Sequence, residues 1–325
     1  MNKSDLKIVF LGTSDFGVPT LAQLKDNGYE VVGVVTKPDF YNKRKKRYEA
    51  TPVKETAINL NIPVLQPTDL KDEKFLSELK ALGGNIFIVI AFQMLPKEVF
   101  TMPEYGTFNI HASILPDYRG AAPINWAIAN GEPRIGLTSF FINEKIDDGD
   151  IIAQASIPNY SNRTFTGVYD ILSLAVCGGL CNETLRLIIE SDGKPKTTKQ
   201  DPSLCVHKAP KITRENTKID FSKSINEIFN HIKAFSTKPG AWAVVKSDDK
   251  HCGKAIKLLN VDVISFGERT TSKVGRLTIS DGKILLYASN GCLHIKGLQL
   301  EGCKAMTAKE FLNGYGDLIE NWVLL

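Results

Sequence analysis

Asn109 and His111 are the first candidates for chemistry, because an amide and an imidazole flank a single apolar residue, Ile110, just before a loop. Alternate residues of a β-strand project to the same face, so both side chains are expected on one face at the end of a strand. A histidine in such a place is also commonly a hydrogen-bonded structural residue. The pair therefore indicates a polar site or a structural anchor at a strand tip.

The loop after this pair, "SILPDYRGAAP", favours the polar site. Pro116, Gly120 and Pro123 restrict its backbone more than a simple connection needs, and functional residues gather in such loops. Asp147, in the turn "KIDDGD", is a third polar candidate, although acidic residues in a glycine turn commonly serve only the turn. The sequence alone does not bring Asp147 to His111.

The sequence pattern predicts that the strands and helices around these residues form β-α-β units. Apolar, β-branched runs typical of buried parallel strands occur at residues 6–12, 29–37, 62–67 and 85–92. The strand with Asn109 and His111 continues this sheet, residues 136–159 predict a strand pair, and residues 166–190 predict a long helix. The fold class predicted for the first domain is α/β, with a doubly wound, mostly parallel sheet. Its first turn, "FLGTSDFG", lacks the glycine spacing of a dinucleotide fingerprint.

A second domain is expected after residue 190. Residues 191–206 are rich in turn formers and poor in large apolar residues, which predicts a linker. Beyond it, a helix at residues 224–236 is followed by short strands separated by glycine turns. That pattern is typical of a small β-barrel, and the five-stranded OB type is expected. The predicted domains are therefore residues 1–190 and 207–325.

Composition limits the class of protein. With 43% hydrophobic and 23% charged residues over 325 positions, the chain is expected to be globular. No apolar run of about 18 residues and no signal peptide are evident, so a cytoplasmic protein without a membrane segment is expected. The six cysteines are scattered, and Cys177 and Cys181 lie four apart as on one face of a buried helix, so neither a disulfide framework nor a metal site is expected.

Charge is unevenly distributed along the chain. From residue 206 onward, 18 Lys and Arg against 12 Asp and Glu give +6, and the remaining 22 against 24 give −2 for the first 205 residues. Such a surplus is commonly only a solvated surface, but it also suits a domain that holds a polyanion.

The spacing of these motifs resembles the folate-dependent formyltransferases. Asn-x-His is followed by "SILP" and "YRGAAPINWAI", and an acid-glycine turn begins 36 residues after the histidine. Further segments of the resemblance, such as "IVFLGTSDFGVPTL", "APKITRENTKIDFSKS" and "KAMTAKEFL", extend over nearly the whole chain. Two features depart from the family pattern: Asp117 replaces a basic or neutral residue, and "AFQMLP" is one residue shorter than usual.

The resemblance implies 10-formyltetrahydrofolate as formyl donor, the α-amino group of methionyl-initiator tRNA as acceptor, and no metal. Formyl transfer passes through a tetrahedral oxyanion, which Asn109 and His111 would stabilise as hydrogen-bond donors. Asp147 would orient the imidazole and relay the proton from the amine. Residues implied to contact the folate are Gln93, Met94, Leu95, Ser113, Ile114, Leu115 and Pro116.

The segment "YNKRKKRYEA" is the candidate for tRNA contact. Its five consecutive cations, Lys43, Arg44, Lys45, Lys46 and Arg47, lie between two tyrosines. A charge run is ordinarily a solvated loop, but cations beside aromatic rings suit phosphate contact and base stacking. The resemblance implies that this loop enters the acceptor end of the tRNA, and the protein is expected to act as a monomer.

Two other interpretations remain open at this point. One is a tRNA-binding module with an inactive formyltransferase-like site, which the complete set of Asn109, His111 and Asp147 disfavours. The other is a formyltransferase that acts on the amine of a sugar nucleotide. The basic loop and the C-terminal domain disfavour that alternative, because a small amino sugar needs neither.

Overall fold

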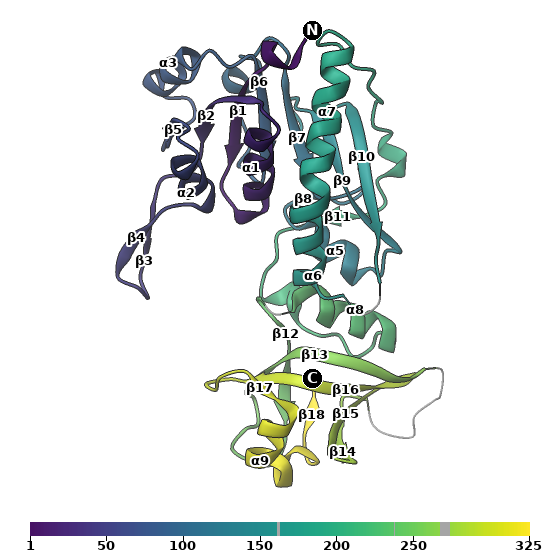
Figure 1. Ribbon diagram of the computed structural model, residues 1–325. Helices are drawn as coiled ribbons and strands as arrows, with labels where there is room; N and C mark the ends of the chain where they lie inside the picture. The colour runs from purple at the N-terminus through teal and green to yellow at the C-terminus, as the bar shows by residue number, and fades with distance from the viewer. Residues whose placement is uncertain (161–162, 237, 267–273) are drawn as a thin grey trace. The chain divides into compact units, whose positions relative to one another are not determined.

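The computed structural model describes residues 1–160, 163–236, 238–266 and 274–325 (Figure 1). The chain divides into two compact units. Unit 1 contains Met1–Gly120, Arg134–Ile157 and Tyr169–Lys208, and unit 2 contains Ala121–Pro133, Pro158–Val168 and Ala209–Leu325. Two early segments of the chain thus belong to the second unit.

Unit 1 is built on one seven-stranded sheet. Its strands, in spatial order, are β10 (Ile151–Pro158), β9 (Arg134–Phe141), β7 (Thr107–His111), β6 (Ile86–Ile90), β1 (Lys7–Gly12), β2 (Glu30–Val35) and β5 (Val64–Leu65). The pairs from β7 to β5 are parallel, and β9 runs antiparallel to β7. The predicted mixed α/β class with a parallel sheet is confirmed, although β5 is much shorter than the predicted strand.

Both faces of this sheet are buried, as a parallel sheet requires. On one face, Val9 and Phe87 pack with Phe75 of α3 (Glu73–Ala81) and Val99 of α4 (Lys97–Phe100). The alternate residues of β1 and β6, such as Phe10, point to the other face and are also fully buried. The helix α2 (Pro52–Asn59) begins at an N-cap, where the Thr51 side chain accepts a hydrogen bond from the backbone N–H of Lys54.

A long helix follows the sheet. It consists of α6 (Phe165–Ile171), a π-helical turn (Leu172–Cys177) and α7 (Gly178–Glu190), which matches the predicted helix. In unit 1, α7 lies beside α1 (Val18–Asp26) (Figure 1). Cys177 and Cys181 are buried, and burial raises the pKa of the Cys177 thiol to about 12, so both thiols are held neutral.

By length and composition the span Phe165–Glu190 could cross a membrane, which the sequence analysis did not predict. Its most apolar window has a mean hydropathy of 1.4, and 50% of that window is buried inside the protein. A core helix of a globular protein passes the same test.

Unit 2 is built on a separate antiparallel sheet. Its strands, in spatial order, are β14 (Leu277–Ser280), β15 (Lys283–Ala288), β16 (Gly291–Leu300), β13 (Ala255–Phe266), β12 (Ala241–Lys246) and β18 (Val323–Leu324), with β17 (Met306–Thr307) paired to β16. Backbone hydrogen bonds also join the two ends of this order. The N–H of Leu324 donates to Gly275 (2.7 Å), and the N–H of Leu277 donates to Trp322 (3.2 Å).

Among the described residues of this unit, the sheet is accompanied by α5 (Pro123–Ala129), α8 (Ile225–Phe235) and α9 (Ala308–Ile319). The predicted helix at 224–236 is confirmed as α8, with Ser224 and Glu227 forming a capping box. The Asn125 side chain of α5 donates to the carbonyl of Ala234 at 2.7 Å. The helix α5 is thereby tied to α8, far along the chain.

Candidate active site

Asn109 and His111 lie at the carboxyl end of β7, in the interior of the sheet of unit 1. Because β1, β6 and β7 are parallel neighbours, the loops that follow them leave the same edge of the sheet, where ligands of open α/β sheets bind. The Asn109 side chain is half-buried and has no hydrogen-bond partner among the described residues. Its amide N–H is therefore free to donate to a substrate.

Both ring nitrogens of the buried His111 face a partner. Nε2 lies 3.0 Å from the carbonyl oxygen of Tyr118, which can only accept, so Nε2 carries a hydrogen. Nδ1 lies 3.8 Å from Oδ2 of Asp147, within ion-pair range but too far for a hydrogen bond. The structure thus brings His111 and Asp147 together, and His111 can donate to a substrate only by exchanging one of these contacts.

Asp147 lies in a tightly held turn between β9 and β10. Its Oδ2 accepts a hydrogen bond from the backbone N–H of Gly120 at 3.0 Å, and its own φ is +50°. Gly149 must lack a side chain, because a Cβ there would lie 1.6 Å from the carbonyl oxygen of Phe141. Gln200 contacts the same turn. Gln200 is not among the predicted site residues, since nothing in the local sequence links it to Asp147, 53 positions earlier.

The loop 113–116 begins directly after β7. Ser113 is buried and its hydroxyl donates to the carbonyl of Asp117, and Leu115 is also buried. The N–H of Leu115 donates to Oγ1 of Thr138, and its carbonyl accepts from Nε2 of Gln154. The N–H of Leu115 is therefore not free to bind a ligand, whereas its carbonyl oxygen has a second lone pair.

The other members of the predicted folate set are more open. Ile114 is 36% exposed, and Pro116 is half-buried. In the loop after β6, Gln93 and Met94 are exposed, the latter by 74%, whereas Leu95 is buried in the core. The exposed members can contact a ligand directly, while Leu95 anchors its loop.

Asp117, the unexpected residue of the loop, has a partner in unit 1. Its Oδ1 accepts from the backbone N–H of His207 at 2.5 Å, and its Oδ2 lies 2.9 Å from the Nδ1 of that histidine. The His207 ring stacks on Tyr118, with centroids 5.0 Å apart. Asp117 therefore fixes a later segment of chain against the loop, which explains an acid at this position.

The basic segment forms a hairpin of β3 (Phe40–Asn42) and β4 (Arg47–Glu49), which extends away from the sheet of unit 1 (Figure 1). Tyr41 pairs with Tyr48 across the strands, and both rings are at least half exposed. The sequence predicts a loop here, because each strand is only three residues long and the segment contains many charges.

The five cations of the hairpin are exposed but not equivalent. Lys45 and Arg47 pair with Glu49 at 2.7 and 3.3 Å, and hydrogen bonds from Lys45 and Asn42 lower the pKa of Glu49 to about 2. Lys43, Arg44 and Lys46 have no ion pair within the described ranges. Three cations of the hairpin are thus unneutralised.

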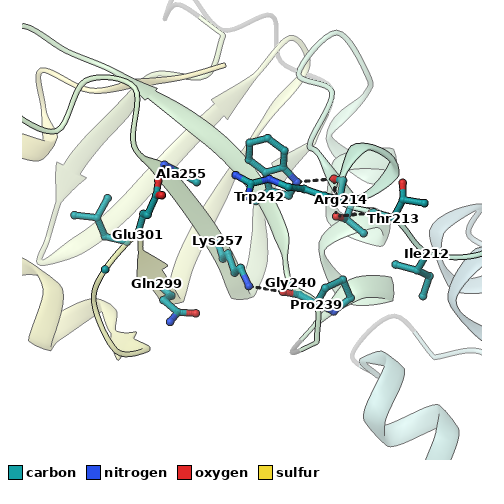
Figure 2. Close-up of a pocket in the computed structure, with 13 residues that line it drawn as sticks. Ile212, Thr213, Arg214, Pro239, Gly240, Trp242, Ala255, Lys257, Gln299 and Glu301 are labelled. Carbon is teal, nitrogen blue, oxygen red and sulfur yellow. Dashed lines mark hydrogen bonds between the residues drawn. The ribbon is translucent and has the colours of Figure 1, made fainter. Parts of the chain in front are cut away.

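Unit 2 contains a cavity of about 420 Å³ (Figure 2). One wall carries Trp242, whose indole N–H donates to the carbonyl of Arg214 while the Arg214 guanidinium lies 4.7 Å from the ring centroid. Another wall carries Lys257, whose Nζ donates to the carbonyl of Pro239 at 2.7 Å. The cavity combines an aromatic ring with two cations, the combination used for nucleotides.

Comparison with known proteins identifies the family of this chain. Residues 6–174 match the family described as formyl transferase, and residues 211–316 match the formyl transferase C-terminal domain. A solved structure of HypX from Aquifex aeolicus, in complex with tetrahydrofolic acid, superposes with a TM-score of 0.62 at 18% identity. That similarity covers 96% of this chain and 47% of HypX, so the chain spans about half of that protein. The two family matches together show that the chain is a formyltransferase.

Two similar proteins indicate which group of formyltransferases the chain belongs to. The methionyl-tRNA formyltransferase of Flavobacterium johnsoniae is 42% identical over 309 residues, which are 95% of this chain and 96% of that protein. The methionyl-tRNA formyltransferase of Parabacteroides distasonis is 39% identical over 98% of this chain and 99% of its own length. The chain belongs to the formyltransferase family and, within it, to the methionyl-tRNA formyltransferases.

Proposed function

We propose that the protein transfers the formyl group of 10-formyltetrahydrofolate to the α-amino group of methionyl-initiator tRNA, in the cytoplasm, as a step of translation initiation. The observation that carries this proposal is the free amide of Asn109 beside a His111–Asp147 pair at the carboxyl edge of the sheet.

The reaction needs no covalent enzyme intermediate. The neutral amine attacks the formyl carbon, the carbonyl oxygen becomes an oxyanion, and the bond from carbon to N10 of the folate then breaks. The Asn109 amide donates to the oxyanion without rearrangement, and His111 donates once its bond to the Tyr118 carbonyl is exchanged for the substrate. The Asp147 carboxylate takes the proton lost by the amine and returns it to N10.

The folate is expected along the exposed parts of two loops. Ile114 and Pro116 offer apolar contact on one side, and Gln93 and Met94 on the other. Ser113, Leu115 and Leu95 are buried and act by shaping these loops.

For the tRNA we propose two contact regions. In unit 1, Lys43, Arg44 and Lys46 contact phosphates while Tyr41 and Tyr48 offer faces for stacking, and the paired Lys45 and Arg47 contribute less. The second region lies in the C-terminal domain, residues 207–325, after a linker at 191–206. Its +6 charge and the cavity beside Trp242 support that role, and the catalytic domain is assigned to residues 1–190.

We further infer that the sheet of the C-terminal domain closes as an OB-like barrel. The backbone bonds of Leu324 to Gly275 and of Leu277 to Trp322 support closure, because they join the first and last strands of the sheet order. The protein is proposed to act as a monomer.

The substrate is tested by comparing acceptors. Purified protein and 10-formyltetrahydrofolate are incubated with methionyl-initiator tRNA or with an amino-sugar nucleotide, and formylated product is measured by mass spectrometry. We expect formylation of the tRNA alone. Turnover of the sugar nucleotide with none on the tRNA would contradict the proposal, and turnover of neither would indicate an inactive tRNA-binding module.

A further inference from the structure

Gln200 is a buried side chain whose carboxamide is fully used in unit 1. Its Nε2 donates to the carbonyl of Asp147 at 2.9 Å and to the carbonyl of Gly149 at 2.8 Å. Those two carbonyls lie at either end of the turn that carries the Asp147 carboxylate. Only 8% of Gln200 is exposed, and a buried carboxamide of this kind requires hydrogen-bond partners.

The segment before Gln200 is fixed to the start of β10. Ile151 and Thr198 exchange two backbone hydrogen bonds of 2.8 Å each. This pairing fixes the position of Gln200 beside the turn 147–149. The turn itself has an uncommon backbone, with Asp147 at φ +50°, and the carbonyls of Asp147 and Gly149 both accept from Gln200, a donor outside the turn.

The other end of the carboxamide is held by Arg119. Oε1 of Gln200 accepts from Nε and Nη2 of Arg119 at 3.1 and 2.6 Å, and Nη1 of Arg119 pairs with Oδ1 of Asp148 at 2.5 Å. The next residue, Gly120, donates its N–H to the Asp147 carboxylate. Gln200 therefore links the main chain of the catalytic turn to the loop that holds the carboxylate itself.

We propose that Gln200 is a positioning residue for formyl transfer: with Arg119 it holds the turn 147–149 so that the Asp147 carboxylate faces Nδ1 of His111. This inference rests on the proposed function. Gln200 acts through Asp147 and contacts neither substrate. Displacing a reacting group by about 1 Å can cost about 100-fold in rate, so loss of the clamp should affect kcat.

The test is a double-mutant cycle between Gln200→Met and Asp147→Asn. Methionine has a similar shape but offers no amide. We expect Gln200→Met to lower the single-turnover rate by about 10- to 100-fold with unchanged KM for both substrates. In the Asp147→Asn background the same change should cost less than about twofold, because the carboxylate being positioned is already absent.

Asn85→Leu is the matched control. The Asn85 amide also bridges two backbone groups, the N–H of Lys7 and the carbonyl of Asp5, but before β6, at the opposite edge of the sheet. We expect it to lower the Tm and leave kcat unchanged. If Gln200→Met does not fold, Gln200→Glu is used, which keeps the acceptor for Arg119 and loses both donors.

The outcomes separate the inference from the proposed function. A wild-type protein that formylates no tRNA refutes the proposed function before any variant is made. With an active wild type, an equal loss from Gln200→Met in both backgrounds, an effect on KM alone, or no effect on kcat in a folded variant would each overturn the positioning role.

Discussion

The imidazole of His111 already has two partners in the free protein, and its replacement tests the role of the ring directly. We expect His111→Asn to lower kcat by about 100- to 1,000-fold, because a donor to the oxyanion is lost. The dissociation constant for tetrahydrofolate, measured by calorimetric titration, should change little. Near-normal turnover would show that the ring has a structural role only, through its hydrogen bond to the Tyr118 carbonyl.

Asp147→Asn tests whether the carboxylate at this site relays the proton. The new carboxamide oxygen can still accept the N–H of Gly120, so the turn should keep its shape, but it cannot take a proton from the amine. We expect a loss of at least about 100-fold in kcat with an unchanged Tm. A variant with wild-type kcat would remove Asp147 from the proton relay.

Variants of the β3–β4 hairpin test recognition of the tRNA separately from catalysis. Replacing the unpaired Lys43, Arg44 and Lys46 by Gln removes up to three phosphate contacts, and the control replaces Lys45 and Arg47, which pair with Glu49. Each lost contact should reduce the slope of log affinity against log salt by about 0.7 to 0.9.

Affinity for charged initiator tRNA is therefore titrated at several salt concentrations. We expect loss of all three contacts in the triple variant to flatten the slope by about 2.1 to 2.7, and the double variant to flatten it by less, with folate binding unchanged in both. Equal slopes for wild type and the triple variant would mean that the hairpin is only a solvated charge run.

The helix α8 contains a buried cation, Lys233, whose burial is expected to lower the free energy of unfolding. Lys233 is 5% exposed, and burial lowers its pKa from 10.5 to about 8. At pH 7 the ammonium is charged in both the folded and the unfolded chain, so the folded state bears the full desolvation penalty. Between pH 8 and 10.5 the unfolded chain binds more protons, and this group makes the protein more stable as the pH rises.

We expect Lys233→Met to raise the free energy of unfolding at pH 7 by about 1–3 kcal/mol, since one pKa unit corresponds to about 1.4 kcal/mol. The gain should shrink as the pH rises from 8 to 10, whereas the exposed Lys246→Met control should show no such trend. Urea unfolding at each pH measures this. A gain independent of pH would mean that packing alone is responsible.

Across the whole chain, the sequence patterns predicted the strands and helices that depend on neighbouring residues. Alternation along the strand correctly predicted that Asn109 and His111 lie at one strand end, and the helix predicted at residues 224–236 is present as α8. The neighbourhood of Asp147 was not predictable in this way. Gln200 reaches it through β10, and Tyr118 competes for the His111 ring, and both contacts depend on tertiary structure.

Asn109 offers the most direct test of the catalytic account, because its amide is the donor that needs no rearrangement. The measurement is the single-turnover rate of formyl transfer by Asn109→Ala at saturating donor and methionyl-initiator tRNA, with both dissociation constants determined separately. We expect a rate about 100- to 1,000-fold below wild type, with both dissociation constants within about threefold of the wild-type values. A rate within about threefold of wild type, or a loss explained entirely by weaker binding, would contradict it.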